Sequence, residues 1–319
     1  KLMADYFKYL GEKQNLALRL TGLYNVNELP LYDDAGAKAS IYSSDYISGG
    51  FKFQSTNFQN STFGVGVNWS DISFKPKVNP YEMDAYTVDG LYVVGNLNHL
   101  KYSVTTFSAF YSLNNLNRRY FPTRGMSANI EVSATSKTNG QIQLDETKYA
   151  IDDLLGEFET SSIKSLKMDV VPVIPVSKKF VFLLKAKMKL SSLADSMQNV
   201  TEFDFIGGFR PDLVNATEYY GAGIKEYYLA NYFYGRLGTQ YELWRNVFLQ
   251  AHINVVTTEF PVTFLYPNAD TGDMAGMTTR FGYGGSIGMN SPVGPVSFAV
   301  AKDHYRDGWK ASLIIGFHY

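Results

Sequence analysis

The sequence has no cysteine, which excludes disulfide bonds and thiolate chemistry. Charged residues make up only 18%, below the roughly 25% of an ordinary soluble protein. The net charge of -1 argues against nucleic acid as a partner. No run of about 18 apolar residues occurs, so helical membrane spans are excluded.

The sequence also lacks the motifs of metal, phosphate and signal segments. Four histidines, at positions 99, 252, 304 and 318, are scattered without the spacing of metal ligands, and no phosphate-binding loop is present. The chain begins at Lys1 without an apolar signal segment, so we expect a mature product or a piece of a longer protein. Catalytic, cofactor and metal sites are therefore not expected in this chain.

Aromatic residues and glycine are abundant instead. The chain has 24 Tyr, 22 Phe and 27 Gly, and aromatics reach 15%. A transmembrane β-barrel combines many aromatics with moderate hydropathy, because its lumen residues dilute the lipid-facing ones. The composition favours one large β domain over two globular domains.

Alternation of apolar and polar residues supports a barrel. Residues 309–319 place apolar side chains at odd positions, over the roughly 9 to 11 residues that cross a bilayer at a tilt. The same pattern recurs at 63–70, 126–135, 180–190 and 281–289. We predict an all-β fold: a transmembrane antiparallel up-and-down barrel with an even strand number, about 12 and up to 16. It occupies residues 1–319 as a single domain, with 1–14 as a lead-in segment.

The connections separate a membrane barrel from a soluble one. Short turns are expected at 56–60, 116–124, 172–177, 245–246 and 291–295, and they alternate with long loops. This asymmetry is typical of outer-membrane barrels. The long loops are expected at 25–45, 72–99, 138–161, 192–227 and 259–278, with a short helix around 151–158. A loss of alternation near Phe107 predicts a β-bulge.

Basic residues line one face of the strand at 180–190. Lys185, Lys187 and Lys189 suit a wet lumen, and Arg236 and Arg280 fall on the polar faces of later strands. Such bases favour anions. Acids at Glu131, Asp169 and Glu242 share that face, however, so a solvated and partly ion-paired interior is the simpler interpretation.

Short motifs resemble the surface-antigen barrel superfamily, which includes outer-membrane protein assembly insertases and two-partner secretion transporters. They are a P-x-x-G turn at Pro122, Thr123, Arg124 and Gly125, a later Gly207-Gly208, and a closing strand with Leu313, Ile315, Gly316, Phe317 and Tyr319. The opening half, N-E-L-P-L-Y-D-D at 27–34 and G-G-F-K-F-Q at 49–54, is more similar to the barrels that follow patatin-like phospholipase domains. The insertases and transporters carry V-R-G-F or V-R-G-Y after the glycine pair, whereas this chain has Phe209-Arg210-Pro211, with Arg210 as an imperfect counterpart.

One motif points to chemistry but lies in the wrong context. The segment 284–288 matches G-x-S-x-G, yet Ser286 falls within a strand, whereas a nucleophile elbow joins a strand to a helix. The resemblance to the patatin-like barrels implies that lipid acyl hydrolysis belongs to a domain upstream of this chain. The chain itself is expected not to be an enzyme.

The expected function is that of an integral protein of the bacterial outer membrane. The resemblance implies that it anchors, displays or exports an attached soluble domain, as in type V secretion. An alternative is a partner-binding component of a larger envelope complex, and a small diffusion porin or an insertase is less favoured. Expected partners are membrane lipid, the barrel assembly machinery through the closing strand, and other envelope proteins. Aromatics at Tyr219, Tyr220, Tyr227 and Tyr228 suit partner contacts or an interfacial aromatic girdle.

Overall fold

A computed structural model describes most of the chain. The described residues are 2–32, 38–58, 60–78, 82–88, 91–136, 138–145, 154–160, 162–192, 204–209, 216–229, 231–258, 278–292 and 294–316. Among these residues no helical segment could span a lipid bilayer.

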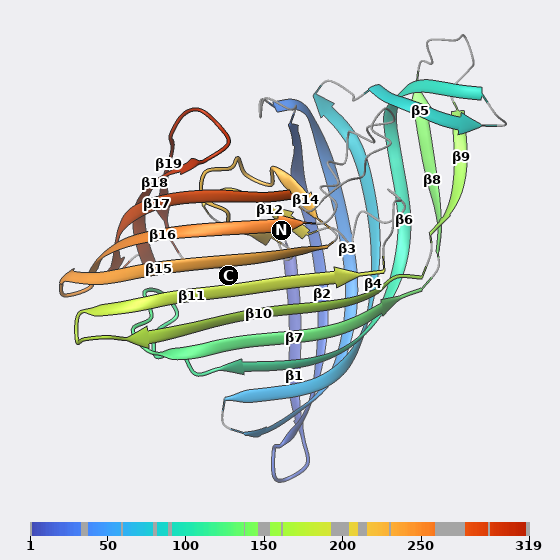
Figure 1. Ribbon diagram of the computed structural model, residues 1–319. Coiled ribbons are helices and arrows are strands. Elements are labelled where there is room, and N and C mark those ends of the chain that lie inside the picture. Colours follow the sequence, from blue (N-terminus) through green and yellow to red (C-terminus); the bar gives the residue numbers. More distant parts are fainter. Residues whose placement is uncertain are drawn as a thin grey trace.

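One curved antiparallel sheet dominates the structure (Figure 1). Sixteen strands belong to it, and three of them lie off the main path, which leaves thirteen that follow one another in chain order. The path consists of β1 (Leu2–Leu10), β2 (Leu16–Tyr32), β3 (Lys38–Phe58), β4 (Ser61–Val78), β6 (Leu91–Asn114), β7 (Gly125–Thr135), β10 (Lys164–Pro175), β11 (Phe180–Ser191), β15 (Tyr232–Trp244), β16 (Val247–Thr258), β17 (Thr278–Ser291), β18 (Gly294–Asp303) and β19 (Lys310–Ile315).

The remaining strands lie off the main path of this wall. The strands β5 (Glu82–Val88), β8 (Thr138–Asp145) and β9 (Leu154–Thr160) extend the sheet beside the N-terminal part of β6. A separate small sheet consists of β12 (Asp204–Ile206), β13 (Ala216–Thr217) and β14 (Tyr227–Leu229), all from the connection between β11 and β15. In Figure 1 this small sheet lies within the curve of the large one.

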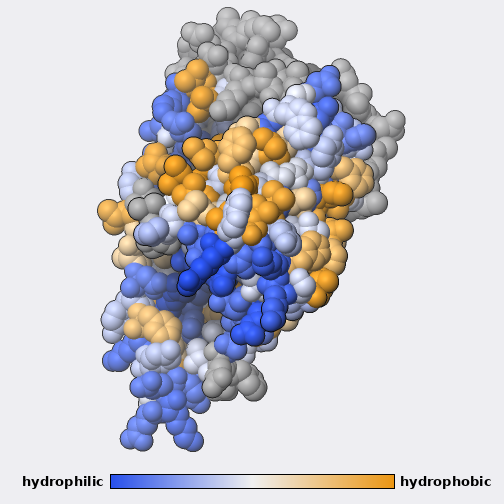
Figure 2. Space-filling model, turned by 90° about the vertical axis from the view of Figure 1, so that its left-hand side faces the viewer, coloured by the Kyte–Doolittle hydropathy of each residue, from blue (hydrophilic) through white to orange (hydrophobic). Residues whose placement is uncertain are grey.

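The outer face of the wall is apolar because side chains alternate along each strand. On β4 the exposed row is Phe63, Val65, Val67 and Trp69, and Leu313 and Ile315 continue the pattern on β19. Exposed apolar rows on many neighbouring strands are what a lipid-facing wall requires. Figure 2 shows one side of the molecule, with hydrophobic side chains in a patch across its upper part and hydrophilic ones below.

The apolar band ends at a sharp boundary. Beyond Trp69 the same face of β4 carries Asp71, whose Oδ1 accepts a 2.8 Å hydrogen bond from Ser103 on β6 and whose Oδ2 lies 3.9 Å from Lys101 Nζ. On the opposite face, the neighbouring Ile72 and Phe74 are buried. The polarity of the two faces therefore inverts just past Trp69.

Several expected loops are strands instead. Residues 72–99 contribute the end of β4, the strand β5 and the start of β6, and 138–161 contribute β8 and β9 in place of the expected helix, of which 151–153 lie outside the described residues. Within 25–45, β2 continues to Tyr32 and β3 begins at Lys38, and the 1–14 lead-in contains β1. These segments lie outside the apolar rows or lack regular alternation, and their strands are defined by backbone pairing with neighbours.

The bulge expected near Phe107 is also absent. Phe107 pairs in regular register with Val67 on β4 and with Ala134 on β7. The register shift on β6 falls instead between Leu97 and His99, where β6 pairs with β8.

The described residues establish the antiparallel order but not its closure. Among them, no pairing joins β1 to β19. A closed barrel and an even strand number therefore stay predictions.

Candidate functional site in the lumen

The inner face of the wall carries a row of bases. Lys185, Lys187 and Lys189 alternate along β11, so all three point to one side. Lys167 on β10 pairs directly with Lys189, and Arg236 on β15 pairs directly with Lys185. Five cations thus gather on three adjacent strands.

Asp204 of β12 neutralises one end of this row. Its carboxylate lies 3.5 Å from Lys167, 3.3 Å from Lys187 and 3.3 Å from Lys189. The hydroxyl of Tyr232 donates a 2.6 Å hydrogen bond to the same carboxylate. Burial disfavours the charged form, but the lysines and the hydroxyl outweigh it and hold the pKa of Asp204 well below its usual value.

Glu218 neutralises the other end. Its two oxygens each accept a 3.2 Å hydrogen bond from Lys185, and Arg236 donates a 2.9 Å bond to Oε1. Burial opposes ionisation here as well, yet Lys185 and Arg236 lower the pKa of Glu218. Between the two acids, Lys187 Nζ lies 2.5 Å from Thr217 Oγ1. The connection between β11 and β15 is therefore held against the wall by its acidic side chains.

A second set of contacts holds the same connection to the last strands. Glu226 forms salt bridges with Arg306 and, at 3.4 Å, with Lys310. The hydroxyl of Tyr227 donates to Asp303 at 3.3 Å and accepts from Arg280 at 3.1 Å. Arg280, expected as a lumen base, thus binds the connection between β11 and β15.

One contact reaches the opposite end of the strand order. Lys225 Nζ donates a 3.0 Å hydrogen bond to the carbonyl oxygen of Glu28 on β2. Lys225 itself is 5% exposed. Adjacent residues of the connection therefore bind β2 on one side and β19 on the other.

The connection between β11 and β15, called the insertion below, lies inside the curve of the wall (Figure 1). The glycine pair Gly207-Gly208 provides the turn into it. Gly207 has φ of +142° and Gly208 has φ of +77°, in the region that favours glycine. A Cβ on Gly207 would lie 2.2 Å from the carbonyl oxygen of Gly223. Both positions require glycine. Arg210, proposed as an imperfect counterpart of the superfamily arginine, lies outside the described residues.

Aromatic side chains fill the space between the insertion and the wall. Tyr220 stacks on His252 of β16 with ring centroids 3.7 Å apart. Tyr219 and Tyr227 are buried with Ile206, Leu229 and other residues of one apolar cluster. The expectation of exposed tyrosines in partner contacts or a membrane girdle is wrong for Tyr219 and Tyr227. They pack the lumen, and the Tyr228 side chain lies outside the described part.

The P-x-x-G turn packs against the inner face of β15 and β16. Phe121, with φ of +48°, stacks on Phe248 with centroids 4.8 Å apart, and the carbonyl of Pro122 accepts a 3.1 Å hydrogen bond from Gln240. Asn117 accepts hydrogen bonds from the backbone of Thr123 and Arg124, and Gly125 has φ of +104°. The turn is thus folded back against the inner wall.

The closing strand β19 pairs with β18 over all of its described length, Lys310–Ile315. Leu313 pairs with Phe298 and Ile315 with Val296, and both are exposed on the outer face. Gly316 donates its backbone N–H to Pro295 at 3.0 Å. Phe317 and Tyr319 lie outside the described residues, so the assembly signal proposed for this strand stays a prediction.

Ser286 occupies a strand, as the sequence indicates. It lies within β17, and its hydroxyl donates a 3.1 Å hydrogen bond to Gln250. Among the described residues no cluster of His, Asp and Glu is arranged to hold a metal ion.

The antiparallel wall, its apolar outer band and its polar inner face are typical of an outer-membrane β-barrel protein. Residues 6–209 match the Omp85 superfamily domain, so the chain belongs to the Omp85 superfamily. Barrel domains of this superfamily are typically non-catalytic, and the chain is an integral protein of the bacterial outer membrane. No curated protein sequence matches the chain.

Solved structures agree on the fold. BamA from Haemophilus ducreyi lacking POTRA domains 1-3 has a TM-score of 0.63 at 15% identity over 98% of this chain. The siderophore receptor PiuA from Acinetobacter baumannii has a TM-score of 0.52 at 10% identity over 94% of this chain. The chain spans 60% of the BamA chain and 48% of the PiuA chain.

Proposed function

We propose that this barrel anchors an attached soluble domain in the outer membrane and displays or exports it. The observation that supports this role best is the connection between β11 and β15, which lies against the inner face of the wall and is held there by buried salt bridges at Asp204, Glu218 and Glu226. A barrel that holds such a connection inside acts through what it anchors in the membrane more readily than through free diffusion. The resemblance of 27–34 and 49–54 to barrels that follow patatin-like domains favours a lipid acyl hydrolase as the attached domain.

A partner-binding role is the second candidate. It is favoured by the extension formed by β5, β8, β9 and the start of β6, which continues the sheet beyond the apolar band. A surface raised above the membrane suits contact with other envelope proteins. An insertase is less favoured, because Phe209-Arg210-Pro211 replaces the superfamily motif after the glycine pair.

The deciding experiment is the intact mass and N-terminal sequence of the protein from outer-membrane preparations. The anchoring role predicts a mass well above 35.8 kDa, with a G-x-S-x-G elbow in the additional sequence. A protein of 35.8 kDa that begins at Lys1 would overturn it in favour of partner binding. Large, steady conductance in planar bilayers at neutral pH would instead favour a porin.

A further inference from the structure

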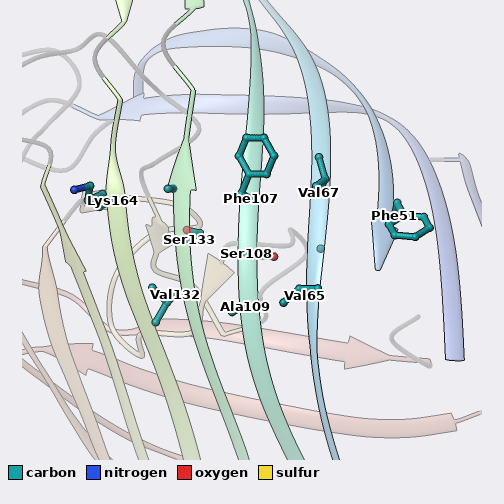
Figure 3. A pocket seen from close by; sticks show the side chains of 11 residues that line it. Phe51, Val65, Val67, Phe107, Ser108, Ala109, Val132, Ser133 and Lys164 are labelled. Atoms are coloured by element: carbon teal, nitrogen blue, oxygen red, sulfur yellow. The ribbon is translucent and has the colours of Figure 1, made fainter. Parts of the chain in front are cut away.

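A recess of about 570 Å³ opens on the outer face of the wall, where β3, β4, β6, β7 and β10 lie side by side (Figure 3). Its size falls within the range of small-molecule sites. Its apolar lining comes from the exposed lipid-facing rows: Phe51, Val65, Val67, Phe107 and Val132.

Small side chains create this recess. Ala109 pairs with Val65 on one side and with Val132 on the other, and Ala134 lies between Phe107 and Lys164. All of these residues line the recess. Alanines between larger neighbours leave a depression in an otherwise filled apolar row.

The recess lies at a defined depth in the membrane. On β4 the outer face is apolar at Val67 and Trp69 and becomes polar at Asp71. On the antiparallel strand β6 the outer face is apolar at Phe107 and becomes polar at Ser103 and Lys101. The recess is therefore the last part of the apolar band before the boundary. Lipid acyl chains end and headgroups begin at such a boundary.

A cation lies at that boundary. Lys164, the first residue of β10, pairs with Ala134 and forms one edge of the recess (Figure 3). It is exposed, and within the described ranges it forms no salt bridge. A lysine at the edge of an apolar surface extends its charge to the headgroup level.

We propose that the recess binds an anionic phospholipid, with an acyl chain over Ala109 and the lipid phosphate at Lys164. The apolar lining matches the chain, and the single lysine matches the anionic group. The site is independent of the role proposed for the barrel, since it lies on the outer face and uses none of the lumen contacts.

Trp69 provides a reporter beside the recess. The chain has three tryptophans, so Trp244→Phe and Trp309→Phe leave Trp69 alone, two residues from Val67 on the same face of β4. The full chain is reconstituted in phosphatidylcholine vesicles, and a lipid brominated on its acyl chain is added in increasing fractions. Brominated phosphatidylglycerol is expected to quench Trp69 at about five-fold lower fraction than brominated phosphatidylcholine.

Two variants test the two halves of the site. Lys164→Gln is expected to remove the preference for phosphatidylglycerol, while Lys178→Gln, in the turn at the opposite end of β10, retains it. Ala109→Leu fills the recess and is expected to weaken quenching by both lipids. Heat-modified migration on gels checks that each variant is folded.

Equal quenching by the two lipids in the parent protein would overturn the proposal. So would a preference that survives Lys164→Gln, because the phosphate would then not lie at that residue. Unchanged quenching in Ala109→Leu would show that no acyl chain occupies the recess.

Discussion

Asp204 shows how single side chains hold the lumen together. It is 1% exposed and is surrounded by three lysines, so its charge and theirs depend on one another. A buried ion pair stabilises the folded state little compared with a well-packed apolar pair. Removal of one partner, however, leaves an uncompensated buried charge that strongly destabilises the folded state. The acidic residues of the insertion are therefore required by the basic wall.

Replacement of Asp204 tests this dependence. Asp204→Asn leaves Lys167, Lys187 and Lys189 without their shared anion, and we expect a loss of about 3–5 kcal/mol in the free energy of unfolding. Urea titration in vesicles measures it, and limited trypsin digestion reports release of the insertion. The matched control is Asp307→Asn in an exposed turn, which is expected to change neither. Unchanged digestion of Asp204→Asn would mean that these salt bridges do not hold the insertion.

At the scale of elements, the connection between β11 and β15 behaves as a separate unit. It has its own small sheet, its own turn at Gly207 and Gly208, and polar contacts with the wall on both sides. Because its strongest contacts are ionic, its attachment depends on the charge of its carboxylates.

Acid is expected to release this connection. The pKa values of Asp204 and Glu218 are lowered when the connection is attached, so the attached state binds fewer protons than the released state. The stabilisation is fully present above about pH 4 and is lost as the pH falls through the lowered values. Bilayer conductance is expected to be small at neutral pH and to rise in this acidic range. The Asp204→Asn/Glu218→Gln double variant should lose this pH dependence; an identical acidic transition in it would exclude these two carboxyls.

At the scale of the whole molecule, the wall separates lipid from a polar interior. Leu237 of β15 is 51% exposed, midway along a strand whose neighbours Leu184 and Ile253 share its face. The cost of a charge on that face depends on depth, because water is reached sooner near either end.

Two arginine variants on β15 measure this depth. Leu237→Arg is expected to destabilise the folded protein by about 2–4 kcal/mol, whereas Tyr241→Arg, nearer the turn at 245–246, should cost about 0–1 kcal/mol. Urea titrations of the protein in vesicles give both values. Equal costs would mean that β15 does not cross the lipid as its exposed row indicates.

The sequence predicts the parts of the fold where membrane contact leaves a pattern. The rows at 63–70, 126–135 and 180–190 alternate because one face meets lipid, and their strands were identified correctly. Beyond the boundary at Trp69 neither face of the sheet contacts lipid. The end of β4, the start of β6 and the strands β5, β8 and β9 therefore lack the alternation that marks the other strands.

The lumen bases were visible in the sequence, but their partners were not. Lys185, Lys187 and Lys189 alternate on one strand, whereas Asp204 and Glu218 lie on a long connection with no period that marks their position. The acids expected to balance these bases were on the wall, at Glu131, Asp169 and Glu242, and of these Asp169 does lie 4.0 Å from Lys185. An excess of bases over acids on β11 was the available signal that the anions come from elsewhere.

The hydrogen bond from Lys225 to the carbonyl of Glu28 joins residues 197 positions apart in the chain. Contacts of such long range form late, because the loop they close must first be brought together. The bond also links β2 to a segment whose next residue, Glu226, binds Lys310 of β19. The strands β2 and β19 are thus linked through this connection only once Lys310 has been made, and we expect a folding intermediate to stay open between these two strands until then.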